Sequence, residues 1–221
     1  MYSTDLTRTQ WQFIKSSLNF KERKRKHDLQ IIWNALHYIV KTGCQWRLLP
    51  VDFPKWELVY YYYSKWASLE LYDLILEKLR CKVRVKMGQK EEASLGIMDS
   101  QSVRWGNNKS LNGMDGNKKI KGIKRHVVVD KNGFLIAVMV CVANIHDSKA
   151  ALLLMRLIKE FLSSIKIILA DGGYRGELAD NVKQIYGYLI KVVMRTDSET
   201  DGFKPVNKRW VIERTFAWFD N

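Results

Sequence analysis

The period of the hydrophobic pattern changes near residue 90 of this chain. Before that point, apolar residues recur every three or four positions, which predicts amphipathic helices at 7–18, 28–43, 54–66 and 70–83. Beyond it, short apolar runs alternate with helical stretches. The change indicates an all-α domain at 1–88, with short helices and tight turns like those of a helix-turn-helix domain, and an α/β domain at 91–221.

The α/β part has a definite order of elements. Strands are expected at 93–98, 122–129 and 134–142, then a helix at 147–163, a strand at 165–170, a helix at 176–186, a strand at 188–194 and a helix from 206 onward. The sequence DKNG at 130–133 is a turn signal between two β-rich runs, so the second and third strands should form an antiparallel hairpin. This order is the layout of a ribonuclease H-like mixed sheet with flanking helices.

Composition restricts the class of partner. Hydrophobic residues make up 47% of the 221 positions and charged residues 27%, as in a globular protein with a core. The formal net charge of +14 favours a polyanion, either nucleic acid or an anionic membrane surface. The longest apolar run, 134–143, is too short to span a bilayer, and the first residues lack the basic start of a secretory signal. We therefore expect a cytoplasmic protein that binds nucleic acid and no membrane.

Basic residues are concentrated in two segments. The segment KERKRK at 21–26 lies between the first two helices, where it is either a solvated loop or a phosphate-contacting patch. Its candidate contacts are Arg23, Lys24, Arg25 and Lys26. The segment 109–125 leads into the hairpin and is either a solvated loop or a row of DNA backbone contacts, which would make binding salt-dependent. Its candidates are Lys118, Lys119, Lys121, Lys124 and Arg125.

Three acidic residues are candidate metal ligands. The apolar runs 94–98 and 167–170 lead directly into Asp99 and Asp171. A single Asp after a strand is usually a loop-start or helix-capping residue, but the predicted topology places these two strands side by side. Glu213 follows on a partly apolar helix, where an ion pair within the helix is the alternative. Carboxylates converging from separate elements are what metal-assisted phosphodiester chemistry requires.

Five short segments, in order and at workable spacings, carry a resemblance that covers essentially the whole chain. They are GCQWRLLP at 43–50, MDSQSV at 98–103, KKIKGIKRH at 118–126, LADGGY at 169–174 and RWVIERTFAW at 209–218. Together they resemble the DDE transposases of bacterial insertion sequences, in which a small helical domain precedes a ribonuclease H-like catalytic domain.

The resemblance implies a DDE-type enzyme that binds the ends of a mobile element, cleaves DNA and transfers the freed strand into a target. It implies Asp99, Asp171 and Glu213 as the catalytic, metal-binding triad, with Mg²⁺ or Mn²⁺ as the cofactor and two ions per site. The expected partners are the terminal inverted repeats and target DNA, with a homodimer on the DNA in the bacterial nucleoid. Arg175 and Arg209 are further DNA-binding candidates; Arg175 is equally plausible as an ordinary surface arginine.

Two departures from the family pattern bear on activity. Family members continue with basic residues on the glutamate helix, whereas this sequence stops at Asn221, and the usual Tyr and Lys of that motif are replaced by Val206 and Asp220. We therefore expect a truncated chain, or one reading frame of a frameshifted product, that is not a fully active enzyme. Two other functions stay open: a non-catalytic remnant that occupies or represses element ends, and a ribonuclease H-like nuclease unrelated to transposition.

Overall fold

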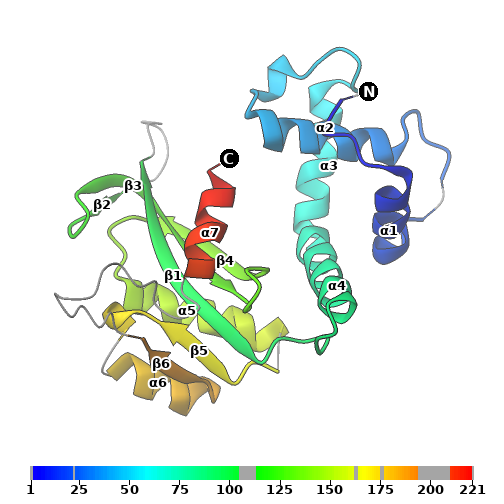
Figure 1. The fold of residues 1–221 in the computed structure, drawn as a ribbon. Coiled ribbons are helices and arrows are strands. Elements are labelled where there is room, and N and C mark those ends of the chain that lie inside the picture. Colours follow the sequence, from blue (N-terminus) through cyan, green and yellow to red (C-terminus); the bar gives the residue numbers. More distant parts are fainter. Residues whose placement is uncertain are drawn as a thin grey trace. The chain divides into compact units, whose positions relative to one another are not determined.

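The structure, a computed structural model, describes residues 2–21, 23–104, 113–161, 164–174, 177–193 and 210–220. The chain divides into two compact units, Met1–Lys82 and Val83–Asn221 (Figure 1). The division lies a few residues before the expected boundary, because Arg84 at the end of the last helix of the first part bonds to residues of the second unit. None of the helices in the described ranges is both long and apolar enough to cross a membrane.

Helices build the first unit. They are α1 (Arg8–Leu18), α2 (Leu29–Thr42), α3 (Trp56–Ser68) and α4 (Leu71–Lys86), whose last four residues belong to the second unit, with a short 3-10 helix at Trp46–Leu48. α1 begins at a capping box between Thr7 and Gln10, and α2 begins at Asp28, whose side chain caps the first turn. Gly43 ends α2 in the left-handed conformation, with φ of 65°. The apolar faces meet in an aromatic core that contains Trp11, Trp33 and Trp66.

A mixed sheet forms the centre of the second unit. Its strands are β1 (Leu95–Arg104), β2 (Gly113–Asp115), β3 (Ile120–Val129), β4 (Leu135–Val142), β5 (Ile167–Ala170) and β6 (Leu189–Val192). The order is β2–β3–β1–β5–β6, and β4 pairs with β3. β3 runs antiparallel to β1, β2 and β4, whereas β5 is parallel to both β1 and β6. This arrangement confirms the expected ribonuclease H-like mixed sheet, with the predicted hairpin as β3 and β4.

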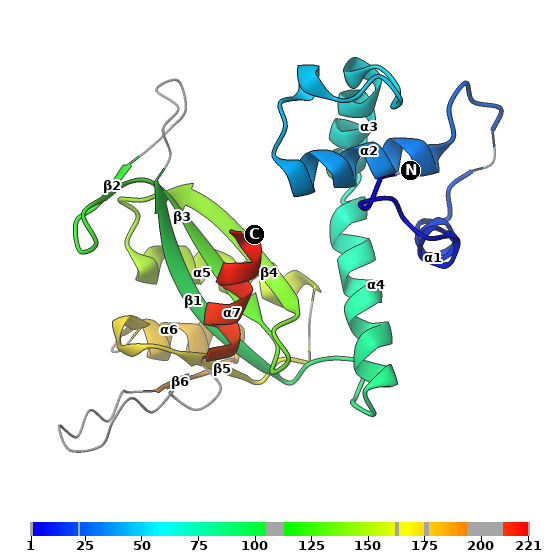
Figure 2. The same cartoon turned by 45° about the horizontal axis from the view of Figure 1, so that its top comes forward.

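Helices cover both faces of the sheet. They are α5 (Asp147–Phe161), α6 (Glu177–Tyr186) and α7 (Trp210–Phe219). Because side chains alternate along a strand, Met98 and Ile168 pack on the face covered by α5 and α6, while Ile97 and Leu169 pack on the opposite face under α7. Figures 1 and 2 show α7 lying across the front of the sheet, with α5 behind it.

Two strands differ from the sequence-based expectation. β1 continues to Arg104, because residues 99–104 keep their pairing with β3, so Asp99 lies within the strand and not at its end. β2 was not expected, since three residues are too few to display a period. Of the predicted helix from 206 onward, residues 206–209 lie outside the described residues, and α7 is described from Trp210.

Candidate active site

Asp99 and Asp171 belong to neighbouring parallel strands. β1 and β5 pair so that Ile97 is opposite Leu169. Two residues further along each chain, Asp99 comes level with Asp171, on the sheet face that also carries Ile97 and Leu169. β5 ends at Ala170, just before Asp171, and both aspartates are half-buried there. The register therefore places two carboxylates side by side where the parallel ladder ends.

The backbone around each aspartate is held locally. The carboxylate of Asp99 accepts a hydrogen bond from the backbone N–H of Ser100, with an N–O distance of 2.7 Å. After Asp171 the chain turns through a short 3-10 helix, Gly172–Tyr174, in which the Tyr174 N–H donates to the Asp171 carbonyl oxygen at 3.2 Å. One aspartate is thus fixed within a paired strand and the other at the start of a hydrogen-bonded turn.

α7 covers the sheet face that carries both aspartates. Its Val211, Ile212 and Phe216 are buried against the apolar residues of that face. Glu213 adjoins this buried stripe and is exposed. The three predicted carboxylates therefore share one face of the sheet, but within the described residues no three Asp, Glu, His or Cys side chains lie close enough together to hold a metal ion.

A buried tyrosine lies beside the aspartates. Tyr174 is 2% exposed and packs in the core between the sheet and α5. Burial raises the pKa of its hydroxyl, and the carboxylates of Asp147 and Asp99 raise that pKa further. The hydroxyl therefore stays protonated at physiological pH, and it belongs to the core on the sheet face opposite α7.

A buried ionic cluster occupies the opposite face of β1 and β3. Lys124 is 5% exposed, and its ammonium lies 3.3 Å from the Asp115 carboxylate and 3.1 Å from that of Asp147. The hydroxyl of Ser102 donates to Asp115 at 2.5 Å, and that of Ser100 to Asp147 at 3.2 Å. Burial alone would raise the pKa of Asp115, but its hydrogen bonds and the lysine charge lower it below its ordinary value. The cluster joins β1, β2, β3 and α5.

The structure separates the predicted DNA-binding lysines into two groups. Lys118, Lys119 and Lys121 are exposed, in the β2–β3 turn and at the start of β3. Lys124 is buried between two carboxylates, so its ammonium is not presented to a phosphate, and this position does not fit the predicted DNA contact. The physical reason is register, because Lys124 shares a sheet face with the buried His126.

The predicted arginine contacts have different surroundings. Arg125 lies on the α7 side of β3, where its guanidinium pairs with Asp220 at 2.9 Å and donates to the side-chain oxygen of Gln101 at 3.4 Å. It stays partly exposed, with 22% of its side chain accessible. Arg175 and Arg209 lie outside the described residues.

The basic segment of the first unit lines a pocket. Its walls include Trp11, Phe20, Arg23, Lys24 and Arg25. Arg25 donates to the carbonyl oxygens of Lys21 at 2.8 Å and Arg23 at 3.2 Å, so this guanidinium holds the loop in shape. Arg23, Lys24 and Lys26 are exposed.

Sequence reasoning missed Tyr174, Asp115 and Asp147 as neighbours of the site. The partners in the Asp115 and Asp147 contacts come from β1, β2, β3 and α5, so no local motif marks the group. The register of β3 on β1, which pairs Ser102 with Lys124, brings this group together. That register is a property of the folded sheet, and the hydrophobic pattern alone does not fix it through the polar stretch that follows Asp99.

Comparisons with known proteins agree with this arrangement. Residues 90–221 match the family described as transposase DDE domain, and residues 6–76 match a family of transposases of the IS4/5 group. A transposase assigned to insertion sequence element IS402 of Burkholderia cepacia is 30% identical over 130 residues. That match covers 55% of this chain and 59% of the relative, so the chain spans less than two thirds of the relative's length.

Solved structures of related fold are more distant. The catalytic core domain of BIV integrase has a TM-score of 0.34 and 17% identity over 57% of this chain and 65% of that chain. The catalytic domain of Mos1 mariner transposase has a TM-score of 0.34 and 10% identity, over 65% of this chain and 79% of that chain. The piggyBac transposase in a synaptic complex with hairpin DNA has a TM-score of 0.39 and 12% identity, over 88% of this chain and 50% of that chain.

Proposed function

Because the chain belongs to the transposase DDE domain family, we propose that it acts as an insertion-sequence transposase, which binds the ends of its element, cleaves DNA there and joins the freed strand to a target. The observation that supports this proposal is the β1–β5 register, because Ile97 pairs with Leu169 and Asp99 and Asp171 each follow two residues later, on the face that α7 covers. Two carboxylates from adjacent strands and a third from a covering helix are a donor set for hard cations.

The two aspartates fit a divalent cation better than the full triad does. Asp99 and Asp171 supply adjacent oxygen donors, whereas Glu213 completes the set only when its exposed side chain turns toward them. Two Mg²⁺ or Mn²⁺ ions held by these carboxylates would activate the attacking oxygen and stabilise charge on the leaving oxygen of a phosphodiester. The protein's own part is to hold the two carboxylates, Asp99 within a paired strand and Asp171 at the start of a hydrogen-bonded turn.

DNA is the partner that the charge distribution favours. Lys118, Lys119 and Lys121 are exposed residues at one end of the sheet, although the Lys118 ammonium also donates to the Ser100 carbonyl oxygen at 3.4 Å, and all three are suited to backbone phosphates. Arg23, Lys24 and Lys26 give the first unit a second basic surface. We assign the terminal inverted repeats and the target DNA to these surfaces, with two copies of the chain holding two ends.

The test is cleavage of a duplex that carries the terminal inverted repeat of the encoding element, in MgCl₂ or MnCl₂ and in EDTA. We expect divalent-ion-dependent nicking at the repeat end, which Asp99→Asn and Asp171→Asn abolish while both variants still bind the duplex. Asp180→Asn is the matched control, because Asp180 is an exposed aspartate of α6 that belongs to no part of the proposed site.

Each alternative function gives a distinct result in the same assay. Binding of the repeat without cleavage in either ion contradicts the enzymatic proposal and identifies a DNA-binding remnant. Equal cleavage of a scrambled duplex contradicts end recognition and identifies a nuclease unrelated to transposition. Cleavage that survives Asp171→Asn places the active site elsewhere in the chain.

A further inference from the structure

The turn between β3 and β4, residues 130–134, is held in one shape by Asp130. This side chain is fully buried, and its carboxylate accepts hydrogen bonds from the backbone N–H groups of Asn132 at 2.8 Å and Phe134 at 3.0 Å. The Asp130 and Phe134 backbones are also bonded, with an N–O distance of 2.9 Å. A buried charge with this many donors fixes its surroundings, because losing any of them leaves the carboxylate unsatisfied.

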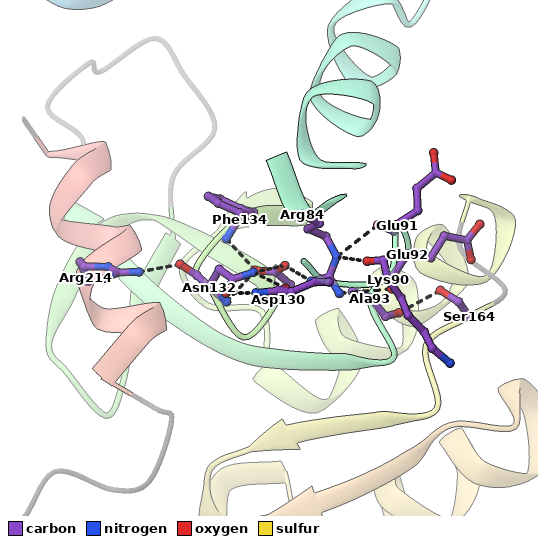
Figure 3. Close-up of polar contacts among 11 residues, drawn as sticks. Arg84, Lys90, Glu91, Glu92, Ala93, Asp130, Asn132, Phe134, Ser164 and Arg214 are labelled. Atoms are coloured by element: carbon purple, nitrogen blue, oxygen red, sulfur yellow. Dashed lines mark hydrogen bonds and ion pairs between the residues drawn. The ribbon is translucent and has the colours of Figure 1, made fainter. Parts of the chain in front are cut away.

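Arg84 neutralises Asp130 from the opposite side. It is 5% exposed, and one terminal nitrogen of its guanidinium pairs with the Asp130 carboxylate. The remaining donors reach the backbone carbonyls of Lys90 at 3.0 Å, Glu91 at 3.1 Å and Glu92 at 3.2 Å. Figure 3 shows Arg84 between the 130–134 turn and residues 90–92, which lead from α4 into β1. The turn is therefore a rigid, fully bonded part of the second unit.

α7 is bonded to the outer side of the same turn. The guanidinium of Arg214 donates to the Asn132 carbonyl oxygen at 2.6 Å, and the Thr215 hydroxyl donates to the Gly133 carbonyl oxygen at 3.2 Å (Figure 3 shows the Arg214 contact). The indoles of Trp210 and Trp218 flank the Arg214 guanidinium, with centroids 4.8 and 4.7 Å away. The two indoles restrict the guanidinium to the direction of the turn. This contact gives the exposed Trp210 and Trp218 a structural role on α7.

Gly133 is the point of closest approach. Its φ is +90°, and a Cβ built there would lie 2.9 Å from the Arg214 guanidinium, 3.1 Å from Val211 and 3.3 Å from the Thr215 hydroxyl. A methyl group there would crowd these three side chains of α7, in a backbone conformation that favours glycine. Gly187 makes a useful comparison, because its φ of +76° is similar but no atom lies within 4 Å of its missing Cβ.

Arg214 and Glu213 lie on either side of the stripe of α7 that is buried against the sheet. Successive residues of an α-helix point about 100° apart. With Val211, Ile212 and Phe216 against the sheet, Arg214 faces the turn and Glu213 points about 100° away from it around the helix axis, on the exposed side of α7. The rotation of α7 about its axis therefore decides where the Glu213 carboxylate points.

We propose that Arg214 is a positioning residue, which locks α7 onto the 130–134 turn and so sets the direction of Glu213 relative to Asp99 and Asp171. The proposal rests on the proposed function, since it concerns the third ligand of that metal site. It gives Arg214 a role through Glu213 and no contact with DNA or metal.

The test is Mn²⁺ binding to the full 221-residue chain, followed by the electron paramagnetic resonance signal of free Mn²⁺. We expect Arg214→Met and Gly133→Ala each to weaken binding about 10-fold, the scale seen when supports of metal ligands are removed. Gly187→Ala should leave binding unchanged, and Arg214→Lys should restore part of it by keeping a donor. In a Glu213→Gln background, Arg214→Met should have no further effect. Hydrogen exchange of residues 210–219 should rise in Arg214→Met but not in Glu213→Gln.

The outcomes separate this inference from the proposed function. Wild-type binding that Asp99→Asn removes, together with unchanged binding in folded Arg214→Met and Gly133→Ala, overturns the positioning role and leaves the metal site intact. An equal loss from Arg214→Met in the Glu213→Gln background also overturns it, because the effect then does not pass through Glu213. Wild-type chain without Asp99-dependent Mn²⁺ binding overturns both proposals.

Discussion

At the scale of single residues, side-chain alternation along β1 and β3 separates two kinds of carboxylate. Asp99 lies on the α7 face, next to the position of Asp171. Asp115 and Asp147 lie on the other face, where they share the ammonium of Lys124. A carboxylate paired with a buried lysine stabilises the fold, whereas Asp99 and Asp171, at the end of the parallel β1–β5 ladder, are the carboxylates that we propose as cation ligands.

The same alternation shows how far the sequence could identify functional residues. An apolar run before an aspartate marks Asp99 and Asp171 as candidates, and their role in a metal site stays a prediction. Lys124 could not be distinguished from its exposed neighbours, because a lysine in a basic run reads as a phosphate contact until the register is known. Arg214 carried no signal for its contact, since its partner Asn132 is 82 positions away in sequence.

His126 makes stability depend on pH. Burial lowers the pKa of its imidazole to about 4, and its neighbours include Asp147, Lys124, Lys118 and Cys141. In the unfolded chain a histidine has a pKa of about 6.5. The unfolded state therefore binds the proton first, so the contribution of His126 is present above pH 6.5 and is lost as the pH falls toward 4.

Urea unfolding at a series of pH values measures this effect. We expect the free energy of unfolding to fall by up to about 1.4 kcal/mol per pH unit between pH 6.5 and 4, with a smaller slope in His126→Asn. Asp115 acts in a different window, because its lowered pKa makes its contribution disappear only below about pH 4. Equal slopes in the wild type and in His126→Asn would show that the imidazole is accessible to protons in the folded state.

At the scale of elements, the long strands and helices were predictable because each has a clear period, and β2 and the polar half of β1 were not. Residues 99–104 look irregular as a sequence, yet they pair with β3 because polar side chains on one strand meet polar side chains on the other, as in the Ser102–Lys124 pair. The sequence also did not predict the contact of α7 with the 130–134 turn. This contact depends on a glycine, a carbonyl oxygen and an arginine that only the folded chain brings together.

The β2–β3 element is expected to supply the salt dependence of DNA binding. Replacing Lys118, Lys119 and Lys121 together by Gln should reduce the slope of log K against log salt concentration by about 3, since each phosphate contact contributes about 0.9 on duplex DNA. Fluorescence anisotropy with a labelled end-repeat duplex measures the slope. The control carries the same charge change at three exposed lysines elsewhere in this unit, Lys149, Lys166 and Lys191. Similar slopes in the two triple variants would mean that net charge alone acts, without a defined surface.

At the scale of the whole molecule, a helical unit and a mixed-sheet unit of the transposase DDE domain family are joined in one basic chain. The change of hydrophobic period near residue 90 predicted helices before it and a mixed sheet after it, and both are present in the described residues. The positive charge favours a polyanionic partner, and DNA as that partner stays a proposal. Neither the hydrophobic period nor the net charge shows whether Glu213 reaches Asp99 and Asp171. That depends on how α7 packs on the 130–134 turn.

The most direct measurement is anomalous diffraction at the manganese edge from crystals of the full chain soaked in MnCl₂. We predict an anomalous peak between the carboxylates of Asp99 and Asp171, with Glu213 turned toward it from α7. Manganese bound only at other residues, in crystals where both aspartates are ordered and the peak between them is absent, would contradict the assignment of this site.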